Sequence, residues 1–240
     1  MKAIILNSGT GSRMGELTKD KPKCLIEIKE GETILSHQLK TLLRNGINDI
    51  IITTGPFEEK IKNHVNNNFP HLQVTYVHSP EYASTNYIYS LFLAKDHINK
   101  NIILIHGDMI VENSVFKKLL HSEHQNAVLT NHDVALPEKD FKGRITNDFI
   151  NEIGVNTFGD DCVSLLPIYK FSEASFKLWI KEIESFVSRG EVNVYAENAF
   201  NNISRELKLK PVQFGKDQEL CMELDNFEDL LVAKKHFDKL

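Results

Sequence analysis

The stretch that most constrains the fold is an apolar run followed at once by a glycine-rich loop, at residues 4–15. The run Ile4-Ile5-Leu6 predicts a buried strand. The loop contains three glycines and Arg13. Glycines let backbone N–H groups approach an anion, and a guanidinium matches the geometry of phosphate. Pro22 then leads to Lys23, a second cation. This order predicts a protein that binds nucleotide phosphates at the end of its first strand.

Two better-known phosphate-binding loops do not fit these residues. No Gly-Lys-Ser/Thr triplet follows Gly9 or Gly11, so the stretch is not a P-loop. Met14 stands where the dinucleotide fingerprint needs its third glycine, and Gly15 comes one residue late.

Apolar segments alternate with helical patterns through the first half of the chain. Strands are predicted at residues 24–28, 49–53, 73–77 and 101–106, and helices at 33–45, 58–67 and 84–97. Such alternation favours a parallel sheet with right-handed crossovers, whose ligands lie beyond the carboxyl ends of the strands.

The second half of the chain is less regular. Strands are predicted at residues 126–131, 163–169, 207–214 and 219–223, and helices at 176–190, 195–203 and 226–237. The polar segment 132–160 is predicted to be an excursion over the active face, outside the core. We therefore predict a single domain over residues 1–240, with an α/β fold: a Rossmann-like, mostly parallel sheet with helices on both faces and a small inserted lid.

Composition excludes several classes of protein. The 41% hydrophobic and 25% charged residues are ordinary for a globular protein, and the net charge of -5 disfavours nucleic-acid binding. No apolar stretch approaches the roughly 20 residues of a membrane span. The first residues enter a strand at once, which leaves no room for a signal peptide, and the three cysteines lack disulfide or metal spacing. We expect a cytoplasmic protein without a membrane span.

The pattern Gly-x-Gly-Ser-Arg, a spacer and then Pro-Lys resembles the signature of the sugar-phosphate nucleotidyltransferases, which activate a phosphorylated metabolite with a nucleoside triphosphate. The resemblance implies the nucleotidyltransferase fold and a nucleotide-binding set consisting of Leu6, Asn7, Ser8, Gly9, Thr10, Gly11, Ser12, Arg13, Asn86, Ser90 and Gly107. It also implies catalytic roles for Arg13, on the β- and γ-phosphates, and for Lys23, on the α-phosphate or the incoming phosphate. Neither cation needs to act as a base, because a phosphate oxygen is already ionised at neutral pH.

Two aspartates are candidate metal ligands. Asp108 closes a buried strand at the sheet edge that faces the glycine loop, and Asp225 follows a later strand. Both match the family's positions for Mg²⁺, which prefers carboxylate oxygens. Glu223 is a competing ligand. The structural alternatives are a turn-forming role for Asp108 and an N-cap of the last helix for Asp225.

The run Asn86-Tyr-Ile-Tyr-Ser-Leu91 resembles the cytidylyltransferases that activate phosphocholine and related amino-alcohol phosphates or phosphonates. The resemblance implies that the Asn86 amide reads the cytosine edge, although Asn86 also suits a helix N-cap. Leu-Asn-Ser-Gly replaces the usual Leu-Ala-Ala-Gly at residues 6–9.

Tyr195 and Glu197 match positions that bind the acceptor in this branch, but Ala196 stands where a second aromatic is expected. We therefore expect phosphocholine to be a poorer acceptor than an unmethylated or polyol phosphate. Lys139 and Lys142, in the polar segment, are further acceptor-binding candidates; the alternative is a solvated loop.

These observations predict an enzyme that condenses CTP with a small phosphorylated or phosphonate alcohol or amino-alcohol, with Mg²⁺, to give a CDP-linked metabolite and pyrophosphate. The alternatives are a sugar-1-phosphate nucleotidyltransferase that uses UTP or dTTP, and an inactive nucleotide-binding sensor. A homo-oligomer is left open.

Overall fold

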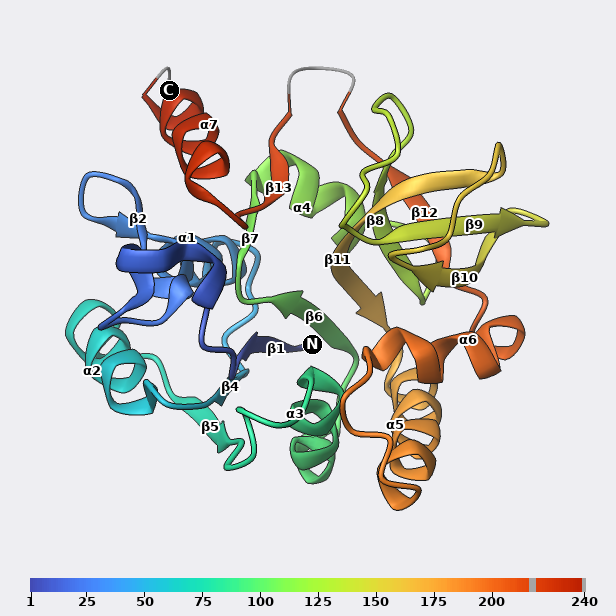
Figure 1. Cartoon of the computed structure of the whole chain (residues 1–240), viewed down its shortest axis with the longest axis horizontal. Coiled ribbons are helices and arrows are strands. Elements are labelled where there is room, and N and C mark those ends of the chain that lie inside the picture. The colour runs from blue at the N-terminus through green and yellow to red at the C-terminus, as the bar shows by residue number, and fades with distance from the viewer. Residues whose placement is uncertain (216–218, 239–240) are drawn as a thin grey trace.

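The computed structural model describes residues 1–215 and 219–238. In these residues a nine-stranded sheet has the order β10-β9-β11-β6-β1-β4-β5, and β8 pairs with β11 and β12 (Figure 1). Its strands are β1 (Lys2–Asn7), β4 (Ile50–Thr54), β5 (Val74–His78), β6 (Ile102–His106), β8 (Ala127–Asn131), β9 (Lys142–Thr146), β10 (Phe149–Gly154), β11 (Cys162–Phe171) and β12 (Lys210–Gln213).

The N-terminal half of the sheet is parallel, as predicted. Strand β1 lies between β4 and β6 and runs parallel to both, and β5 extends the parallel set beyond β4. Strands β1, β4 and β6 are almost wholly buried, as in sheets covered on both faces, whereas β5 is half-buried at the edge. Strand β11 runs antiparallel to β6 and connects the parallel half to the strands of the second half.

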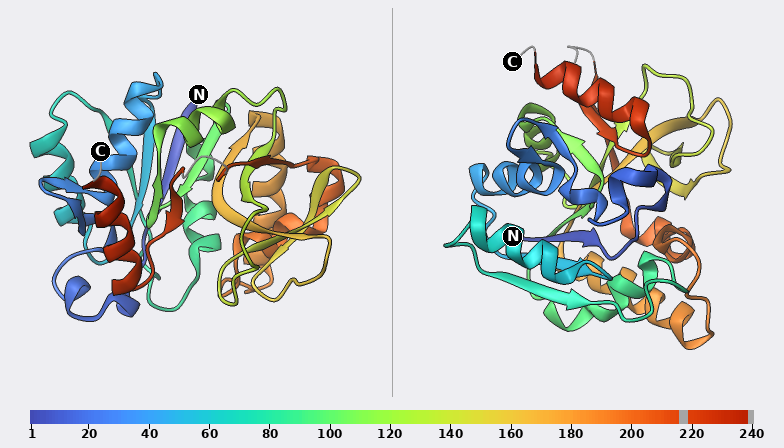
Figure 2. Two further views of the ribbon diagram at one scale, coloured as in Figure 1. Left: turned by 90° about the horizontal axis from the view of Figure 1, so that it is seen from above. Right: turned by 60° about the vertical axis from the view of Figure 1, so that its left-hand side comes forward.

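Helices cover both faces of the sheet (Figures 1 and 2). Helices α1 (Ile34–Arg44), α2 (Glu58–Asn68) and α4 (Asn113–Leu120) share one core with the sheet, and α3 (Tyr87–Leu93), α5 (Glu173–Ser188) and α6 (Ala196–Leu207) share the other. Their apolar residues recur at helical spacing, such as Leu35, Leu39 and Leu42 in α1, so each helix buries one stripe. The predicted fold class is confirmed.

A third, smaller core joins the two ends of the chain. Strand β7 (Met109–Val111) pairs antiparallel with β13 (Cys221–Glu223), β2 (Glu27–Lys29) pairs antiparallel with β3 (Glu32–Thr33), and α7 (Phe227–Phe237) packs on β2. Met14, Ile28, Ile110, Leu224 and Leu230 are buried together there. This core brings the glycine loop to the last strand.

The prediction for residues 132–160 is partly wrong. Strands β9 and β10 form a hairpin at the end of the main sheet, and Ile150 and Ile153 are buried in its core. The hairpin turns at Asn147 and Asp148, which have the positive φ that such turns need. Charged residues and Gly143 interrupt the apolar pattern that would have predicted β9. Gly143 is needed for close packing, because a Cβ there would lie 2.9 Å from Ile150 Cδ1.

Two N-terminal elements also differ from their predicted bounds. The predicted strand 24–28 is a 3-10 turn, Lys23–Leu25, followed by β2, and the predicted helix 84–97 is α3 followed by a 3-10 turn, Lys95–His97. Asn86 delays the start of α3 because its side chain caps the helix.

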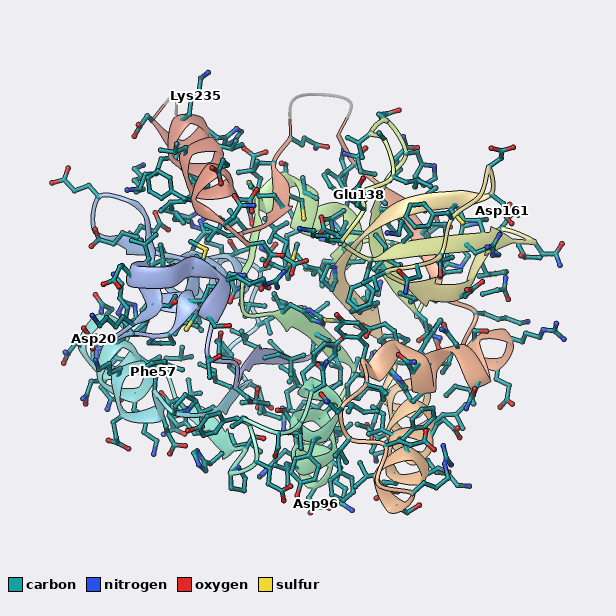
Figure 3. All side chains as sticks on the ribbon, in the orientation of Figure 1. Asp20, Phe57, Asp96, Glu138, Asp161 and Lys235 are labelled. Atoms are coloured by element: carbon teal, nitrogen blue, oxygen red, sulfur yellow. The ribbon has the colours of Figure 1, made fainter. Side chains whose placement is uncertain are left out.

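Charged side chains, such as Asp96, Asp161 and Lys235, point outward around the rim of the molecule (Figure 3). Within residues 1–215 and 219–238, no helix is both long and apolar enough to span a bilayer.

Candidate active site

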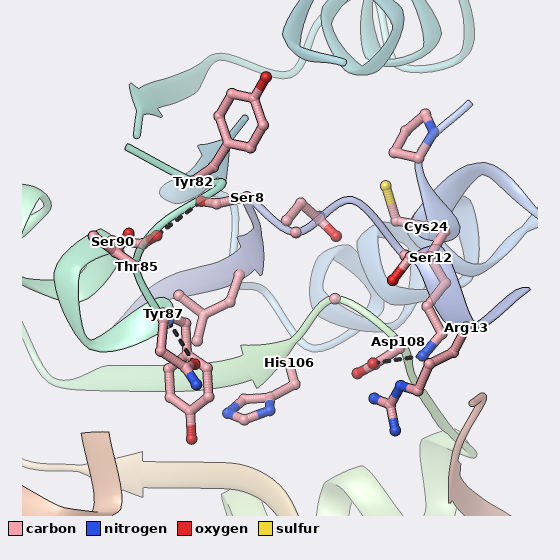
Figure 4. A pocket seen from close by; sticks show the side chains of 18 residues that line it. Ser8, Ser12, Arg13, Cys24, Tyr82, Thr85, Tyr87, Ser90, His106 and Asp108 are labelled. Atoms are coloured by element: carbon pink, nitrogen blue, oxygen red, sulfur yellow. Dashed lines mark hydrogen bonds and ion pairs between the residues drawn. The ribbon is translucent and has the colours of Figure 1, made fainter. Parts of the chain in front are cut away.

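The carboxyl ends of β1 and β6 open onto a cavity of about 350 Å³ (Figure 4). Of the nucleotide-binding residues predicted from the sequence, those that line it are Leu6, Asn7, Ser8, Gly9, Gly11, Ser12, Arg13, Asn86, Ser90 and Gly107; Thr10 does not. Lys23 and Asp108 also line it. A cavity at this edge of a parallel sheet is the expected place for a nucleotide.

Left-handed glycines shape the loop that follows β1. Gly11 has φ 68° and precedes the 3-10 helix Ser12–Thr18. A Cβ at Gly11 would lie 3.1 Å from Lys23 Cβ, so the loop folds closely over Lys23. The hydroxyl of Thr18 donates to the Gly11 carbonyl at 2.8 Å and holds this fold. The loop therefore presents Arg13 and Lys23 to the same cavity.

A chain of buried hydroxyls fixes the base of the loop. Ser90 Oγ donates to Ser8 Oγ at 3.0 Å, and Ser8 Oγ donates to Thr53 Oγ1 at 2.9 Å (Figure 4 shows the first bond). The Asn7 N–H donates to the same Thr53 oxygen at 3.1 Å. The serine that replaces alanine at position 8 thus ties β1 to both β4 and α3.

Asn86 is an N-cap, as the structural alternative predicted. Its Oδ1 accepts from the Tyr87 N–H at 2.8 Å, and its backbone N–H donates to the Val192 carbonyl at 2.8 Å. The cap uses the carbonyl of the side-chain amide and leaves the NH₂ group without a protein partner among the described residues, and Asn86 lines the cavity.

Two cations and two aspartates meet at the mouth of the cavity. Lys23 Nζ lies 2.8 Å from Asp108 Oδ2 and 2.7 Å from Asp225 Oδ1. Arg13 Nη1 lies 2.5 Å from Asp225 Oδ2, and its side chain is 63% exposed. Asn226, not Asp225, caps α7 through a capping box with Asp229. The side chain of Asp225 is therefore directed to the two cations rather than to the helix.

Burial and charge shift the pKa values of this cluster. Burial opposes the charges of Lys23 and Asp108, but their mutual attraction outweighs it, raising the pKa of Lys23 and lowering that of Asp108. Burial, with Asp108 and Asp225 nearby, raises the pKa of Glu223 to about 9.

The same cluster suits a divalent cation. Oxygen atoms of Asp108, Glu223 and Asp225 lie within 4.8 Å of one another. Mg²⁺ prefers oxygen ligands and usually binds one or two carboxylates together with substrate phosphates, which this cluster beside the glycine loop can provide. Because β13 carries Glu223 into the register opposite Met109, Glu223 belongs to this set as well as the two aspartates.

Aromatic rings surround Tyr195 on the acceptor side. The Tyr195 ring lies 6.0 Å from that of Tyr87 and 5.1 Å from that of Phe141, and His106 lies 4.7 Å from Tyr87. Tyr87 and Phe141 are therefore aromatic neighbours of Tyr195 that come from distant parts of the sequence, while the weaker binding of phosphocholine stays a prediction. Tyr87 and His106 line the cavity.

Glu197 lies buried beneath these rings, 1% exposed. It accepts a hydrogen bond from Tyr169 Oη at 2.8 Å and another from Tyr87 Oη. Burial and the charge of Glu197 raise the pKa values of both tyrosines, so both remain hydroxyl donors. In the part of the chain that the structure describes, no ion pair neutralises Glu197.

The two lysines of the polar segment lie in different surroundings. Lys142 is buried; its Nζ donates to the Pro137 carbonyl at 2.6 Å and lies over the Phe158 ring, so it supports the loop. Lys139 is exposed and lines a second cavity of about 380 Å³ beside Arg13 and Asp225. Only Lys139 therefore lies where an acceptor or a phosphate would meet it.

Sequence reasoning missed Tyr87, Phe141 and His106 as candidate site residues. His106 directly precedes Gly107 and Asp108, so its place at the sheet edge was available as a signal. Its Nε2 is buried without a partner. Phe141 carried no such signal, because the segment around it was expected to lie outside the core.

Comparison with known proteins agrees with this geometry. The sequence profile of the nucleotidyl transferase family matches residues 2–140. This chain belongs to that family. Over 190 residues the chain is 29% identical to the CTP:phosphoglutamine cytidylyltransferase of Campylobacter jejuni, covering 72% of this chain and 73% of that protein. It is 25% identical over 236 residues to the choline-phosphate cytidylyltransferase of Haemophilus influenzae, covering 95% and 94%.

A solved structure shares the fold. The CTP:phosphocholine cytidylyltransferase from Streptococcus pneumoniae superposes with a TM-score of 0.78 at 21% identity, over 98% of each chain. The family that the glycine loop predicted is therefore confirmed, together with its fold.

Proposed function

We propose that this nucleotidyltransferase is a cytidylyltransferase that joins CTP to a small acceptor bearing a phosphate or phosphonate and an amine, and releases pyrophosphate. The observation that carries the proposal is the convergence of Lys23, Arg13, Asp108 and Asp225 at the mouth of the glycine-loop cavity. Two cations and a carboxylate set there match the charge of a triphosphate with its metal.

The choice of CTP rests on the relatives and on Asn86. The similar proteins named above carry CTP or choline-phosphate cytidylyltransferase in their names. The helix cap does not use the NH₂ group of Asn86. This group is a hydrogen-bond donor, and the O2 and N3 atoms of cytosine are acceptors that it could bind. Ser90, one turn into α3, holds the loop on the opposite side of the cavity.

Asp108, Glu223 and Asp225 would hold Mg²⁺, which would neutralise charge on the triphosphate and on the departing pyrophosphate. The remaining charge on the two substrates is neutralised by Lys23 and Arg13. An oxygen of the acceptor phosphate attacks the α-phosphorus of CTP, and the bond from that phosphorus to the oxygen bridging to the β-phosphate breaks. Lys23 screens the two anions that approach each other, and Arg13 holds the pyrophosphate portion. No proton is transferred, because the attacking oxygen is already ionised.

The acceptor's amine is inferred from Glu197 and the rings above it. The carboxylate of Glu197 is buried without a cationic partner among the described residues and accepts from the Tyr87 hydroxyl, so it adds negative potential at the edge of the Tyr87 ring. Aromatic rings bind ammonium groups, and a nearby carboxylate strengthens that attraction. A small amino-alcohol phosphate or aminoalkyl phosphonate presents this charge beside its anion.

Pyrophosphate release with a panel of nucleotides and acceptors tests the proposal. We expect turnover with CTP and with phosphocholine, phosphoethanolamine or 2-aminoethylphosphonate, and little with UTP or dTTP. Turnover with UTP or dTTP and glucose 1-phosphate alone would instead identify a sugar-1-phosphate nucleotidyltransferase. Tight CTP binding without turnover on any acceptor would identify a sensor.

A further inference from the structure

Gln38 is a buried polar residue on the apolar face of α1, 1% exposed and close to Leu35, Leu39 and Leu42 in sequence. Its Nε2 donates to the His106 carbonyl at 3.0 Å and to the Met109 carbonyl at 2.8 Å. These two carbonyls flank the dipeptide Gly107-Asp108. One side-chain amide therefore holds both ends of the turn that carries a candidate metal ligand.

Backbone bonds hold the same turn from its other sides. The Gly107 N–H donates to the Leu6 carbonyl at 3.0 Å, and the Leu224 N–H donates to the Asp108 carbonyl at 3.0 Å. Leu224 lies between Glu223 and Asp225, so this bond sets the spacing of all three carboxylates. Gln38 adds two side-chain hydrogen bonds to these backbone bonds that hold the Gly107-Asp108 turn.

The orientation of the Gln38 amide is determined by its contacts. Both amide hydrogens are used, while Oε1 is buried and has no partner. The opposite orientation would place Oε1 against two carbonyl oxygens, which only accept. A buried acceptor without a partner destabilises a fold, and an apolar residue would avoid it. The position therefore serves the turn rather than the packing of α1.

We infer that Gln38 is a positioning residue, which sets the affinity of the Asp108, Glu223 and Asp225 cluster for its divalent cation by fixing the Gly107-Asp108 turn. The inference rests on the proposed function, because it takes these carboxylates to be the metal ligands. Partners that orient metal ligands from outside change affinity by about 10–100-fold when removed. We expect about a tenfold loss for Gln38→Met, which keeps the size and removes both donors.

His37 provides a matched control. It lies next to Gln38 on α1 and donates through Nε2 to the Val111 carbonyl at 2.8 Å, farther along the same strand β7. His37→Leu removes a buried hydrogen bond between α1 and β7, and the 3.5 Å contact of His37 Nδ1 with Glu32, without touching the turn. The Tm of each variant is measured beside its Mn²⁺ affinity, so that a loss of stability is distinguished from a loss of metal binding.

Mn²⁺ binding, followed by electron paramagnetic resonance with a non-cleavable CTP analogue present, tests the inference without turnover. We expect Gln38→Met to bind Mn²⁺ about tenfold more weakly than wild type, and His37→Leu to bind within twofold of it, at similar losses of Tm. Should Gln38→Met not fold, Gln38→Asn, which keeps the amide but is one methylene too short, serves for the same comparison.

The outcomes separate two kinds of failure. Equal Mn²⁺ affinity in Gln38→Met and wild type, or an equal loss in His37→Leu, overturns the role of Gln38. If wild type with the CTP analogue binds no more Mn²⁺ than the analogue binds alone, both the metal site and this inference are overturned. Pyrophosphate release by the same wild-type preparation reports separately on the proposed function.

Discussion

Replacing Lys23 with methionine should destabilise the protein and slow turnover, yet strengthen the binding of a divalent cation alone. The Lys23 ammonium contacts two carboxylates, and its side chain is only 12% exposed. Breaking a buried ion pair costs about 3–5 kcal/mol. Because Asp108 and Asp225 retain 19% and 16% exposure and Arg13 remains beside Asp225, we expect the lower figure, about 3 kcal/mol.

For a chain of this length, about 3 kcal/mol corresponds to a fall in Tm of roughly 6–12 °C. Mg²⁺ would replace the missing positive charge between the same carboxylates. At about 100 times its Kd, a bound ion restores about 2.7 kcal/mol, which is nearly the whole loss. In wild type the ion must first displace Lys23, so the same Mg²⁺ concentration should raise its Tm much less.

Thermal melts of wild type and Lys23→Met across an Mg²⁺ titration measure this difference, and pyrophosphate release measures turnover. We expect turnover to fall by about 10²–10³-fold, the effect of removing one preorganised charge from a reacting anion. Lys21→Met, on the same loop, is the matched control. A Tm of Lys23→Met that responds to Mg²⁺ no more than wild type would refute the reasoning.

Four further predictions follow from other contacts in the structure. Asp108→Asn and Asp225→Asn should each lower turnover about 100-fold or more while melting cooperatively; near-normal rates at limiting Mg²⁺ would remove that residue from the metal site. Arg13→Ala should raise the KM for CTP and lower kcat together, measured by steady-state kinetics, because its charge-assisted bonds serve bound substrate and transition state alike. The hydrogen bond from His37 lowers the pKa of Glu32 to about 2. The ionised Glu32 carboxylate should therefore stabilise the fold fully above the ordinary pKa of a glutamate, and this stabilisation should be lost as the pH falls toward 2. The Tm of Glu32→Gln should accordingly lie below that of wild type near neutral pH and equal it near pH 2. Glu197→Gln should weaken amine-bearing acceptors selectively, as kcat/KM comparisons would show.

The phosphate loop could be predicted because its chemistry is local. Glycine, hydroxyl and cationic residues follow one another between a strand and a turn, and their spacing alone limits what they can bind. The parallel strands were equally visible, because a strand buried on both faces is a continuous apolar run. The carboxylate cluster was predictable in part, since Asp108 follows such a strand and Asp225 follows the short strand β13.

The acceptor side could not be predicted in the same way, because long-range packing builds it. Phe141 reaches Tyr195 only through the path of β9, whose strand pattern is hidden by Gly143 and charged neighbours. The role of Gln38 depends on a contact between α1 and a turn 68 residues away. No local pattern distinguishes that glutamine from a solvent-facing one.

From the position of Glu197 we propose that acceptor charge, rather than acceptor size, decides which acceptors bind. Its carboxylate lies at the hydroxyl end of the Tyr87 ring, and two tyrosine hydroxyls hold it without a cation among the described residues. Glutamine has nearly the same shape but no charge, so Glu197→Gln tests electrostatics at almost constant packing. A cation–π contact is worth about 0.5–2 kcal/mol, and losing the charge behind it should cost about tenfold in kcat/KM for phosphoethanolamine or phosphocholine. Glycerol phosphate, which has the anion but no amine, should change by less than about twofold, since it gains nothing from the carboxylate. An equal loss for glycerol phosphate and the amines would show that Glu197 supports the fold of the cavity and does not select the acceptor.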